Sequence, residues 1–349
     1  MNPLLWPTAS PPPIPLISPS AINTYMRCPR KLAFQRDPSL RNLSKPTLRS
    51  ALGVAAHSLH EIAATNSPPP NQEFEGWLRE EWERLLGEQS VRVAEAWPGR
   101  AVPPAGQWNG VVATRVRTLR TLAQSRASSP SARKSRTETG FPWIERRLED
   151  LDTGIFGTPD RVDVRNGQLR VVDLKSGVYQ AEMQPGQRLQ LLLYAHLVDV
   201  ACNQLPTVGV IKDARGIEST FQIDSVAVTR AIAVARQVMT QYNAAVALRD
   251  VPASPEAATC LNCPYRVVCE PYWSSEARSA GDLRGTVSHV ESRSFAVDTG
   301  TSGAVRVVAA QGCAVPAIGD EVVVLDLLPA GSGTLRMRWN SDIRLPSEE

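Results

Sequence analysis

The sequence lacks the features that would mark it as a membrane protein, a secreted protein or a general electrostatic binder of nucleic acid. The sequence holds no run of about 18 or more apolar residues, so nothing in it is expected to span a membrane. Lysine is scarce, with five among the 38 basic residues, and the 35 acidic residues leave a net charge of only +3. A chain so close to neutral is not a general electrostatic binder of nucleic acid, so any such contact must come from a local patch.

The start of the chain also lacks the basic segment and unbroken apolar run of a secretory signal. Residues 1–18 instead contain six prolines. Residues 1–17 are therefore expected to form a flexible leader, and the protein is expected to be cytoplasmic and reduced. In a reducing compartment, the crowding of Cys260, Cys263 and Cys269 favours metal ligands over disulfides.

The 349 residues are more than one hydrophobic core usually serves. The first third has mostly helical spacing, the middle alternates strands with helices, and the segment beyond 282 has five short strand patterns typical of a small barrel. The polar segment 126–142 is expected to be a mobile loop. Helices are predicted over 18–36, 48–64, 74–96, 110–125, 186–202 and 226–249, and the other strands over 143–151, 153–165, 168–177, 207–213 and 217–224.

The strongest local signal is the pair Asn166-Gly167 between two strand patterns. A two-residue turn there pairs residues whose numbers sum to 333. This register places Asp160 opposite Asp173, with Cβ atoms roughly 5 Å apart, where like charges destabilise a sheet. Alternation keeps Lys175 on the same face as Asp173.

A sheet tolerates two facing carboxylates when a cation lies between them. Hard oxygen ligands select Mg²⁺ or Mn²⁺, which lowers the pKa of bound water and stabilises a leaving oxygen. The arrangement predicts metal-assisted phosphodiester hydrolysis, with Lys175 orienting the water or neutralising charge. The alternative is that Asp160 and Asp173 are ordinary strand-end residues at the solvent edge, and a β-bulge would also shift their register.

These residues resemble the motifs of the PD-(D/E)XK nucleases, in particular the RecB-type group with the AddB nuclease domain and the iron-sulfur exonucleases of CRISPR adaptation. The G-x-x-D and D/E-x-K pair of that group is matched by 157–160 and 173–175. Its G-x-x-x-H helix motif is matched by 53–57 and its Q-x-x-x-Y motif by 190–194. The resemblance covers about residues 18–275 and does not include the C-terminal strands.

The resemblance implies an α/β fold with a restriction-endonuclease-like core and a helical N-terminal part. We expect a nuclease domain over 18–278 and a small OB-like β-barrel over 279–349. The barrel carries residues that fit either DNA contacts or core packing and protein docking, namely Arg284, Arg293, Arg306, Arg336, Arg338, Phe295 and Trp339.

The resemblance also assigns site residues. Gln190 and Tyr194 share one helical face, which fits contacts to the DNA backbone or to active-site water, although Tyr194 would equally cap the core. An imidazole on an amphipathic helix is otherwise a solvated or core residue, so His57 is a metal ligand by resemblance alone. The implied catalytic residues are His57, Asp160, Asp173 and Lys175, of which the first three hold the Mg²⁺ or Mn²⁺ ion.

Iron-sulfur members of that group bind their cluster through one cysteine near the N-terminus and three near the end of the nuclease domain. Cys28, Cys260, Cys263 and Cys269 fit this arrangement. Spacing alone allows either Zn²⁺ or a [4Fe-4S] cluster, and the resemblance favours the cluster. Its role would be structural, because it joins two ends of a very large loop.

Together these features predict a Mg²⁺- or Mn²⁺-dependent deoxyribonuclease. The resemblance adds a preference for single-stranded ends, an exonuclease mode, and a setting in DNA repair, CRISPR adaptation or phage defence. No G-x-x-x-x-G-K-[ST] motif occurs, so unwinding of duplex DNA would need a separate helicase. The competing hypothesis is a non-catalytic DNA-binding or adaptor protein of a repair or defence complex, stabilised by a metal site of four cysteines.

Overall fold

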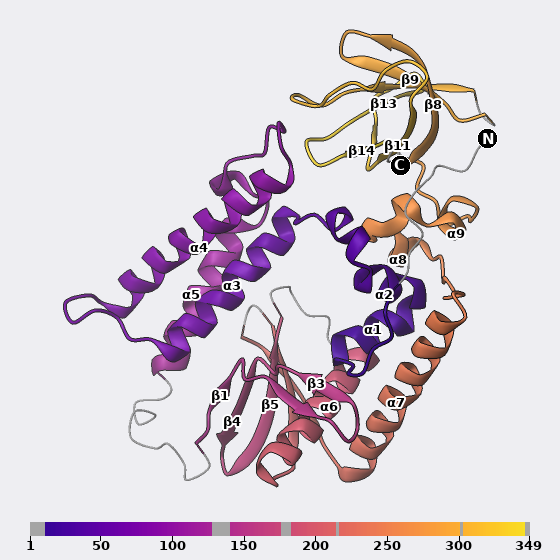
Figure 1. Cartoon of the computed structure of the whole chain (residues 1–349). Helices are drawn as coiled ribbons and strands as arrows, with labels where there is room; N and C mark the ends of the chain where they lie inside the picture. The colour runs from indigo at the N-terminus through magenta and orange to yellow at the C-terminus, as the bar shows by residue number, and fades with distance from the viewer. Residues whose placement is uncertain (1–10, 128–139, 176–182, 214–215, 301–302, 346–349) are drawn as a thin grey trace.

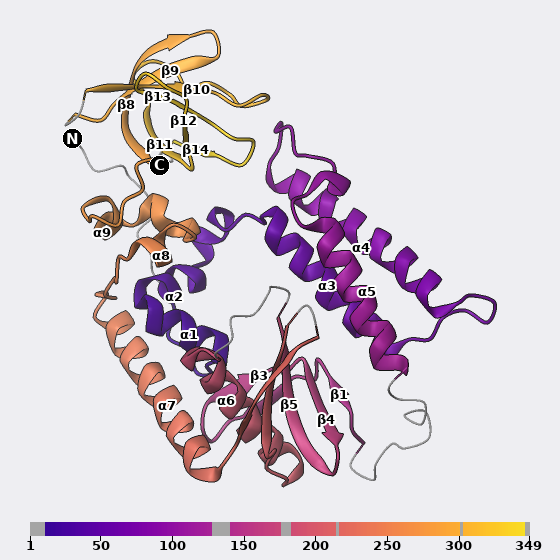
Figure 2. The same ribbon diagram turned by 180° about the vertical axis from the view of Figure 1, so that it is seen from behind.

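The computed structural model describes residues 11–127, 140–175, 183–213, 216–300 and 303–345 (Figure 1). They form a helical N-terminal part, a mixed five-stranded sheet and a C-terminal seven-stranded sheet. In both views the C-terminal sheet lies at the end of the molecule far from the five-stranded sheet (Figures 1 and 2). None of the helices in these ranges has the length and apolar composition needed to cross a membrane.

Most helices of the first third begin and end close to the predicted residues. The single helix predicted over 18–36 is wrong, because Pro29 disfavours helical backbone at Cys28, which is extended (φ −162°, ψ 107°). Ser18 caps the first of the two resulting helices by accepting a hydrogen bond from the Ala21 N–H. The helices are α1 (Pro19–Arg27), α2 (Pro29–Arg36), η1 (Pro38–Leu43), α3 (Leu48–Thr65), α4 (Phe74–Ala96), η2 (Ala105–Gln107) and α5 (Val111–Ala127).

The central sheet is mixed, and a hairpin beside it is separate. The strands expected over 143–151 and 153–165 are each divided, because Glu145 has a positive φ (45°) and Pro159 has no N–H for a ladder. The sheet consists of β1 (Trp143–Ile144), β4 (Arg161–Arg165), β5 (Gln168–Leu174), β6 (Val208–Lys212) and β7 (Glu218–Gln222), in that spatial order, and the hairpin of β2 (Leu148–Asp150) and β3 (Ile155–Gly157). β5 and β6 are parallel and joined through helix α6 (Pro185–Cys202), whereas the other neighbours are antiparallel.

The register of β4 against β5 agrees with the prediction, since the numbers of all five bonded pairs sum to 333. Asn166 and Gly167 have φ values of 53° and 74°, as the two central residues of a type I′ turn require. Arg170 Nε donates to Asp163 Oδ1 at 2.8 Å, which forms a cross-strand ion pair on the opposite face from Asp173.

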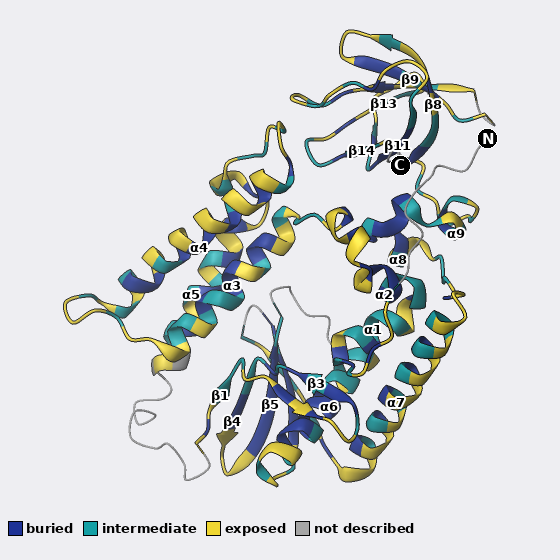
Figure 3. Ribbon diagram, viewed as in Figure 1, coloured by how far each residue is buried: buried dark blue, intermediate teal, exposed yellow. Residues whose placement is uncertain are grey.

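Two separate hydrophobic cores flank the boundary where the site lies. Helices α6 and α7 (Ser225–Ala247) cover one face of the sheet, where Val162 and Val171 are completely buried. Helices α3, α4 and α5 pack around their own core, and buried positions lie along all three helices (Figure 3). This core is rich in tryptophan. Because neither core extends through the boundary between sheet and bundle, polar side chains gather there.

Residues 11–17 differ from the flexible leader expected over 1–17. Ile14 and Ile17 are only 3% and 1% exposed. The backbone N–H of Ile17 donates to Gly154 O at 2.8 Å, and Ile17 O accepts a bond from the Phe156 N–H at 3.1 Å. The apolar isoleucines between the prolines therefore anchor this segment beside β3, whereas residues 1–10 lie outside the described chain.

The C-terminal sheet has seven strands where the sequence predicts five. The strand expected over 320–328 is divided at Asp326, which has a φ of 62°, and the final strand was not predicted. Its order is β12-β13-β10-β9-β8-β11-β14, and β10 pairs in parallel with β13. The strands are β8 (Leu283–Glu291), β9 (Ser294–Asp298), β10 (Ala304–Val308), β11 (Glu321–Leu325), β12 (Leu328–Pro329), β13 (Thr334–Arg336) and β14 (Asp342–Arg344).

Buried charges attach this sheet to the segment that carries three of the cysteines, which contains α8 (Ala257–Cys260), η3 (Pro264–Val268) and α9 (Glu270–Trp273). Arg266 donates to Asp282 at 2.6 Å and to Asp326 at 2.7 Å, and the Tyr272 hydroxyl donates to Asp282 at 2.6 Å. The Asp282 side chain is completely buried. The sheet and the cysteine segment are thus held together by hydrogen-bonded charges that lie away from solvent.

The turn predicts a measurable cost for a side chain at Gly167. An alanine there must adopt the left-handed backbone, so Gly167→Ala should lower the free energy of unfolding by about 1 kcal/mol. No atom lies within 4 Å of an added Cβ, so the cost is conformational. Gly106→Ala is the matched control, since that glycine also has open space and no positive φ. Equal urea midpoints for the two variants would contradict the turn geometry.

Candidate metal and nucleic-acid site

Three acidic residues lie in one row across β1, β4 and β5. Paired numbers of β1 and β4 sum to 305, which places Glu145 opposite Asp160 one residue beyond the last bonded pair. The backbone N–H of Glu145 donates to Asp160 O at 3.2 Å, in agreement with that register. The register of β4 and β5, continued by one residue, places Asp173 on the other side of Asp160. The middle acid therefore has an acidic neighbour on each side.

The pKa of Asp160 is raised in this row of acids. Burial, together with the charge of Asp173, raises the pKa of Asp160 to about 6. The Leu174 N–H, which donates to Asp160 Oδ2, and the nearby His57 and Lys175 have the opposite effect. Burial also raises the pKa of Asp173. Near neutral pH the row therefore holds carboxylates that would be stabilised by a cation.

Glu145 is the site residue that the sequence analysis missed. Burial raises the pKa of Glu145 to about 7, with contributions from the charges of Asp160, Glu61 and Asp173. One ligand atom each from His57, Glu145 and Asp160 lies within 4.8 Å of the others. In the described chain, no other three His, Cys, Asp or Glu residues are gathered so closely. The two carboxylate oxygens suit Mg²⁺ or Mn²⁺, and the softer imidazole nitrogen favours Mn²⁺ of the two.

No local signal in the sequence would have identified Glu145. Its neighbour Asp160 lies 15 positions away, across a connection that contains the separate hairpin of β2 and β3. A register can be read only where a tight turn joins two strands, and β1 and β4 have no such turn. The one usable hint is an acid directly after the short apolar pair Trp143-Ile144.

Asp173 belongs to the row but is held by other side chains. Its Oδ2 atom lies 2.7 Å from Lys175 Nζ, and its Oδ1 atom accepts a hydrogen bond from Gln190 Nε2 at 3.0 Å. The same amide nitrogen lies 3.1 Å from the hydroxyl of Tyr194. Thus α6 places both predicted residues of the Q-x-x-x-Y motif against the acid of the D-x-K motif.

The sequence predicts His57, Asp160 and Asp173 as the metal ligands, and the three residues that the structure places close together differ from this set in one residue. His57 and Asp160 are together, as expected, but Glu145 is the third close ligand in place of Asp173. The reason is that Asp160 occupies the middle of the row, and α3 brings His57 to the β1 side of it. Asp173 lies next to this triad and pairs with the cation of Lys175.

Gly157, the first residue of the G-x-x-D motif, provides space for the aromatic ring of Tyr194. A Cβ atom at Gly157 would lie 2.6 Å from Cε1 of that ring. Tyr194 is 7% exposed, so the ring packs in the core while its hydroxyl reaches Gln190. Tyr194 therefore combines the two roles between which the sequence left a choice.

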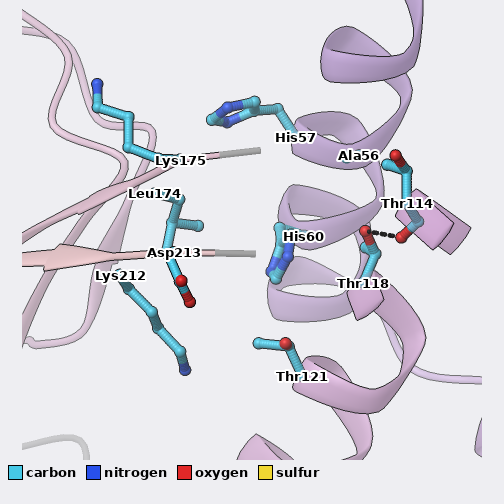
Figure 4. A pocket seen from close by; sticks show the side chains of 10 residues that line it. All are labelled: Ala56, His57, His60, Thr114, Thr118, Thr121, Leu174, Lys175, Lys212 and Asp213. Atoms are coloured by element: carbon cyan, nitrogen blue, oxygen red, sulfur yellow. Dashed lines mark hydrogen bonds between the residues drawn. The ribbon is translucent and has the colours of Figure 1, made fainter. Parts of the chain in front are cut away.

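A cavity of about 420 Å³, open to solvent, adjoins the acids between α3, α5 and the ends of β5 and β6 (Figure 4). His57 and Lys175 lie toward one end of the view, and His60, Lys212 and Thr121 toward the other. Burial lowers the pKa of His60 to about 4, and nearby positive groups contribute, so its imidazole is neutral at pH 7.

The four predicted cysteines line one second cavity of about 350 Å³. Cys28 lies at the break between α1 and α2, and the other three come from the segment 260–269. No three of the four sulfur atoms lie within 4.8 Å of one another, although the structure describes all four. A tetrahedral zinc site with Zn–S bonds of about 2.3 Å would bring its sulfurs to about 3.8 Å. The observed arrangement is wider than that.

The surroundings of the cysteines contain compensating positive charge. Burial raises the pKa of the thiols in the segment 260–269, that of Cys269 to about 11. Arg30, Lys31 and Arg266 lie close enough to oppose this effect. A group that requires four thiolates would therefore gain from these cations.

The aromatic residues of the C-terminal sheet are engaged in packing. Phe295 is 1% exposed, and Trp339 packs edge-on against Trp97 at the end of α4, with ring centroids 5.8 Å apart. Arg306 pairs with Glu291 at 2.8 Å. These contacts favour core packing of the two aromatic side chains over base stacking.

The raised pKa of Glu145 predicts a pH-dependent gain in stability on its removal. In metal-free protein the unfolded glutamate ionises near its usual pKa of 4.5, whereas the folded one ionises near 7. Stability is therefore lost as the pH rises from 4.5 to 7. Glu145→Gln should raise the free energy of unfolding at pH 8 by about 1 kcal/mol, a value discounted for solvent screening.

The comparison is made by urea unfolding in EDTA at pH 8 and at pH 4. The difference between Glu145→Gln and wild type should be absent at pH 4, and added Mn²⁺ should stabilise wild type more than the variant. The exposed Glu149 supplies the control, because Glu149→Gln should change stability by less than about 0.5 kcal/mol at either pH. A destabilised Glu145→Gln at pH 8 would refute the repulsive row.

The geometry agrees with a comparison against protein families. The family model of the PD-(D/E)XK nuclease superfamily matches residues 16–270, which include the acid row, α6 and the four cysteines. A search of curated proteins returned no significant match. Since the matched residues make up most of the chain, the protein belongs to the PD-(D/E)XK nuclease superfamily.

Proposed function

We propose that the protein is a Mg²⁺- or Mn²⁺-dependent deoxyribonuclease that hydrolyses phosphodiester bonds. The observation that carries this proposal is the convergence of His57, Glu145 and Asp160 within 4.8 Å beside Asp173 and Lys175. The pKa values of Glu145 and Asp160 are raised, and His57 and Lys175 beside this row line a solvent-open cavity, an arrangement typical of functional sites. Membership of a nuclease superfamily supports the assignment of this arrangement to phosphodiester hydrolysis.

His57, Glu145 and Asp160 are the residues that would hold the metal, with Asp173 next to them. When bound, a divalent ion lowers the pKa of coordinated water and stabilises negative charge on phosphate oxygens. Asp160 is oriented for this by the Leu174 N–H, which fixes one of its oxygens.

Lys175 and Gln190 position the remaining groups. Lys175 is 34% exposed at its side chain, so its ammonium reaches both Asp173 and a phosphate in the cavity. It would neutralise charge that develops on the phosphoryl oxygens. Gln190 holds Asp173 through its amide nitrogen, and Tyr194 restrains that amide in turn, so the pair acts on DNA indirectly by fixing the acid.

A finer assignment follows from the sequence motifs. We infer a RecB-type exonuclease that prefers single-stranded ends and serves DNA repair, CRISPR adaptation or phage defence. A helicase would supply single strands where the substrate is duplex, and the C-terminal sheet, proposed as an OB-like barrel, would dock against such a partner. The single-strand preference is supported by the resemblance of the five motifs to that group.

We further propose that Cys28, Cys260, Cys263 and Cys269 bind a [4Fe-4S] cluster. Support comes from their shared cavity and from three nearby cations. Such a cluster would clip the break between α1 and α2 to the end of the nuclease domain, in a reducing compartment such as the cytoplasm.

The nuclease proposal is tested on end-labelled single- and double-stranded DNA. Wild type should degrade DNA with Mn²⁺ or Mg²⁺ and spare it in EDTA. Asp160→Asn, Asp173→Asn and Lys175→Met should each lower the rate by about a hundredfold or more. Asp152→Asn, at an exposed aspartate in the turn before β3, should cut like wild type. Full activity of Asp173→Asn would reject the catalytic assignment and leave the adaptor hypothesis.

The cluster proposal is tested on anaerobically purified protein. We expect a brown protein with four iron and four acid-labile sulfide per chain, as a [4Fe-4S] cluster requires. Cys260→Ala should lose the colour, whereas Cys202→Ala and Cys313→Ala, at the two cysteines outside the cavity, should keep it. Colourless protein with one equivalent of zinc would disprove the cluster.

A further inference from the structure

The end of the cavity away from His57 contains polar groups that the proposed cleavage chemistry does not use. His60 of α3, Lys212 of β6 and Thr121 of α5 point toward one another across this space (Figure 4). They come from three elements that are distant in sequence, so their convergence results from the fold. His60 follows His57 by nearly one helical turn on the same side of α3, a rise of about 5 Å.

Lys212 is a half-buried cation without an ion pair. In the part of the chain that the structure describes, no carboxylate lies within 4.0 Å of its ammonium. Its cross-strand neighbour Glu218 is instead engaged by Arg165 at 3.3 Å and by Arg170 at 3.2 Å. Glu218 attracts Lys212 only from a distance, and a half-buried cation with no anion in contact costs free energy, so an anionic ligand in contact with Lys212 would be stabilised.

His60 is the second unused group. Its imidazole makes no hydrogen bond within the described residues, although its side chain is mostly covered. A neutral imidazole offers one N–H donor, which a phosphate oxygen can accept. Asp213 also lines this cavity, but its Oδ1 atom accepts the Ile217 N–H at 2.9 Å, so its charge is partly compensated by backbone.

From this convergence we propose that His60 and Lys212 form a subsite for a second phosphate of the DNA strand, adjacent to the phosphate that is cleaved. The subsite rests on the proposed nuclease function and extends it. The strand would run along α3 from His57 and Lys175 to His60 and Lys212. The two histidines lie three residues apart on α3, so the two phosphates would lie side by side along this helix. The subsite positions the strand and takes no part in bond breaking.

The test measures binding of short oligothymidylates in Ca²⁺, which supports binding without efficient cleavage in many Mg²⁺ enzymes. In each oligonucleotide one linkage is a neutral methylphosphonate. For wild type, a methylphosphonate at one linkage next to the scissile linkage should weaken binding by about tenfold, because one charge-assisted contact is lost. A methylphosphonate at the more distant linkages should have a smaller effect. Lys212→Met should bind the unmodified strand about tenfold more weakly, with a salt slope smaller by about 1.

The decisive comparison is whether the loss of affinity caused by the methylphosphonate adds to the loss caused by Lys212→Met. In Lys212→Met the same methylphosphonate should have no further effect, because the charge and its partner are removed together. His60→Ala should raise KM in Mn²⁺ with kcat within about twofold of wild type, as expected for a positioning residue. Arg165→Met is the control, since it removes one charge from the same sheet and leaves Glu218 paired with Arg170.

The outcomes separate the two proposals. If wild type degrades DNA and Lys212→Met responds to every methylphosphonate as wild type does, the second-phosphate subsite is wrong and the nuclease function stands. If wild type neither degrades nor binds DNA, the nuclease function fails, and the subsite fails with it.

Discussion

The site depends on strand register. Two constant registers, one between β1 and β4 and one between β4 and β5, bring Glu145, Asp160 and Asp173 into one row at the edge of the central sheet. A slip of one residue in either pair would move an acid to the opposite face. The folded chain thus holds like charges together through backbone hydrogen bonds, and burial, together with their mutual repulsion, raises the pKa values of Glu145 and Asp160. Such an arrangement is stabilised when a divalent cation binds.

The rest of the fold supports that row from two sides. α6 covers the core face, where Gln190 holds Asp173 and the ring of Tyr194 fits over Gly157. α3 approaches from the separate tryptophan-rich bundle and brings His57 to the other side of the row. The bundle and the sheet have different cores, and a cavity open to solvent lies between them. The cysteine cavity lies where Cys28, near the start of the residues matched by the family model, meets the segment 260–269 near their end.

Much of this arrangement could be predicted from the sequence, wherever the determining interaction is local. Asn166-Gly167 specified the turn and therefore the relation of Asp160 to Asp173, and Gln190 and Tyr194 are one helical turn apart. Glu145 could not be found, because its position depends on a long-range pairing with no turn to define it. The split at Cys28 could have been read from Pro29, whereas the burial of Ile17 depends on β3, which is distant in sequence.

The central claim is that the acid row binds a divalent metal ion used in cleavage. Its most direct test is a crystal structure of the protein soaked in Mn²⁺, with anomalous diffraction recorded at the manganese edge. The account predicts an anomalous peak coordinated by His57, Glu145 and Asp160, next to Asp173. A fully occupied manganese site elsewhere, or no peak at these residues at saturating Mn²⁺, would contradict it.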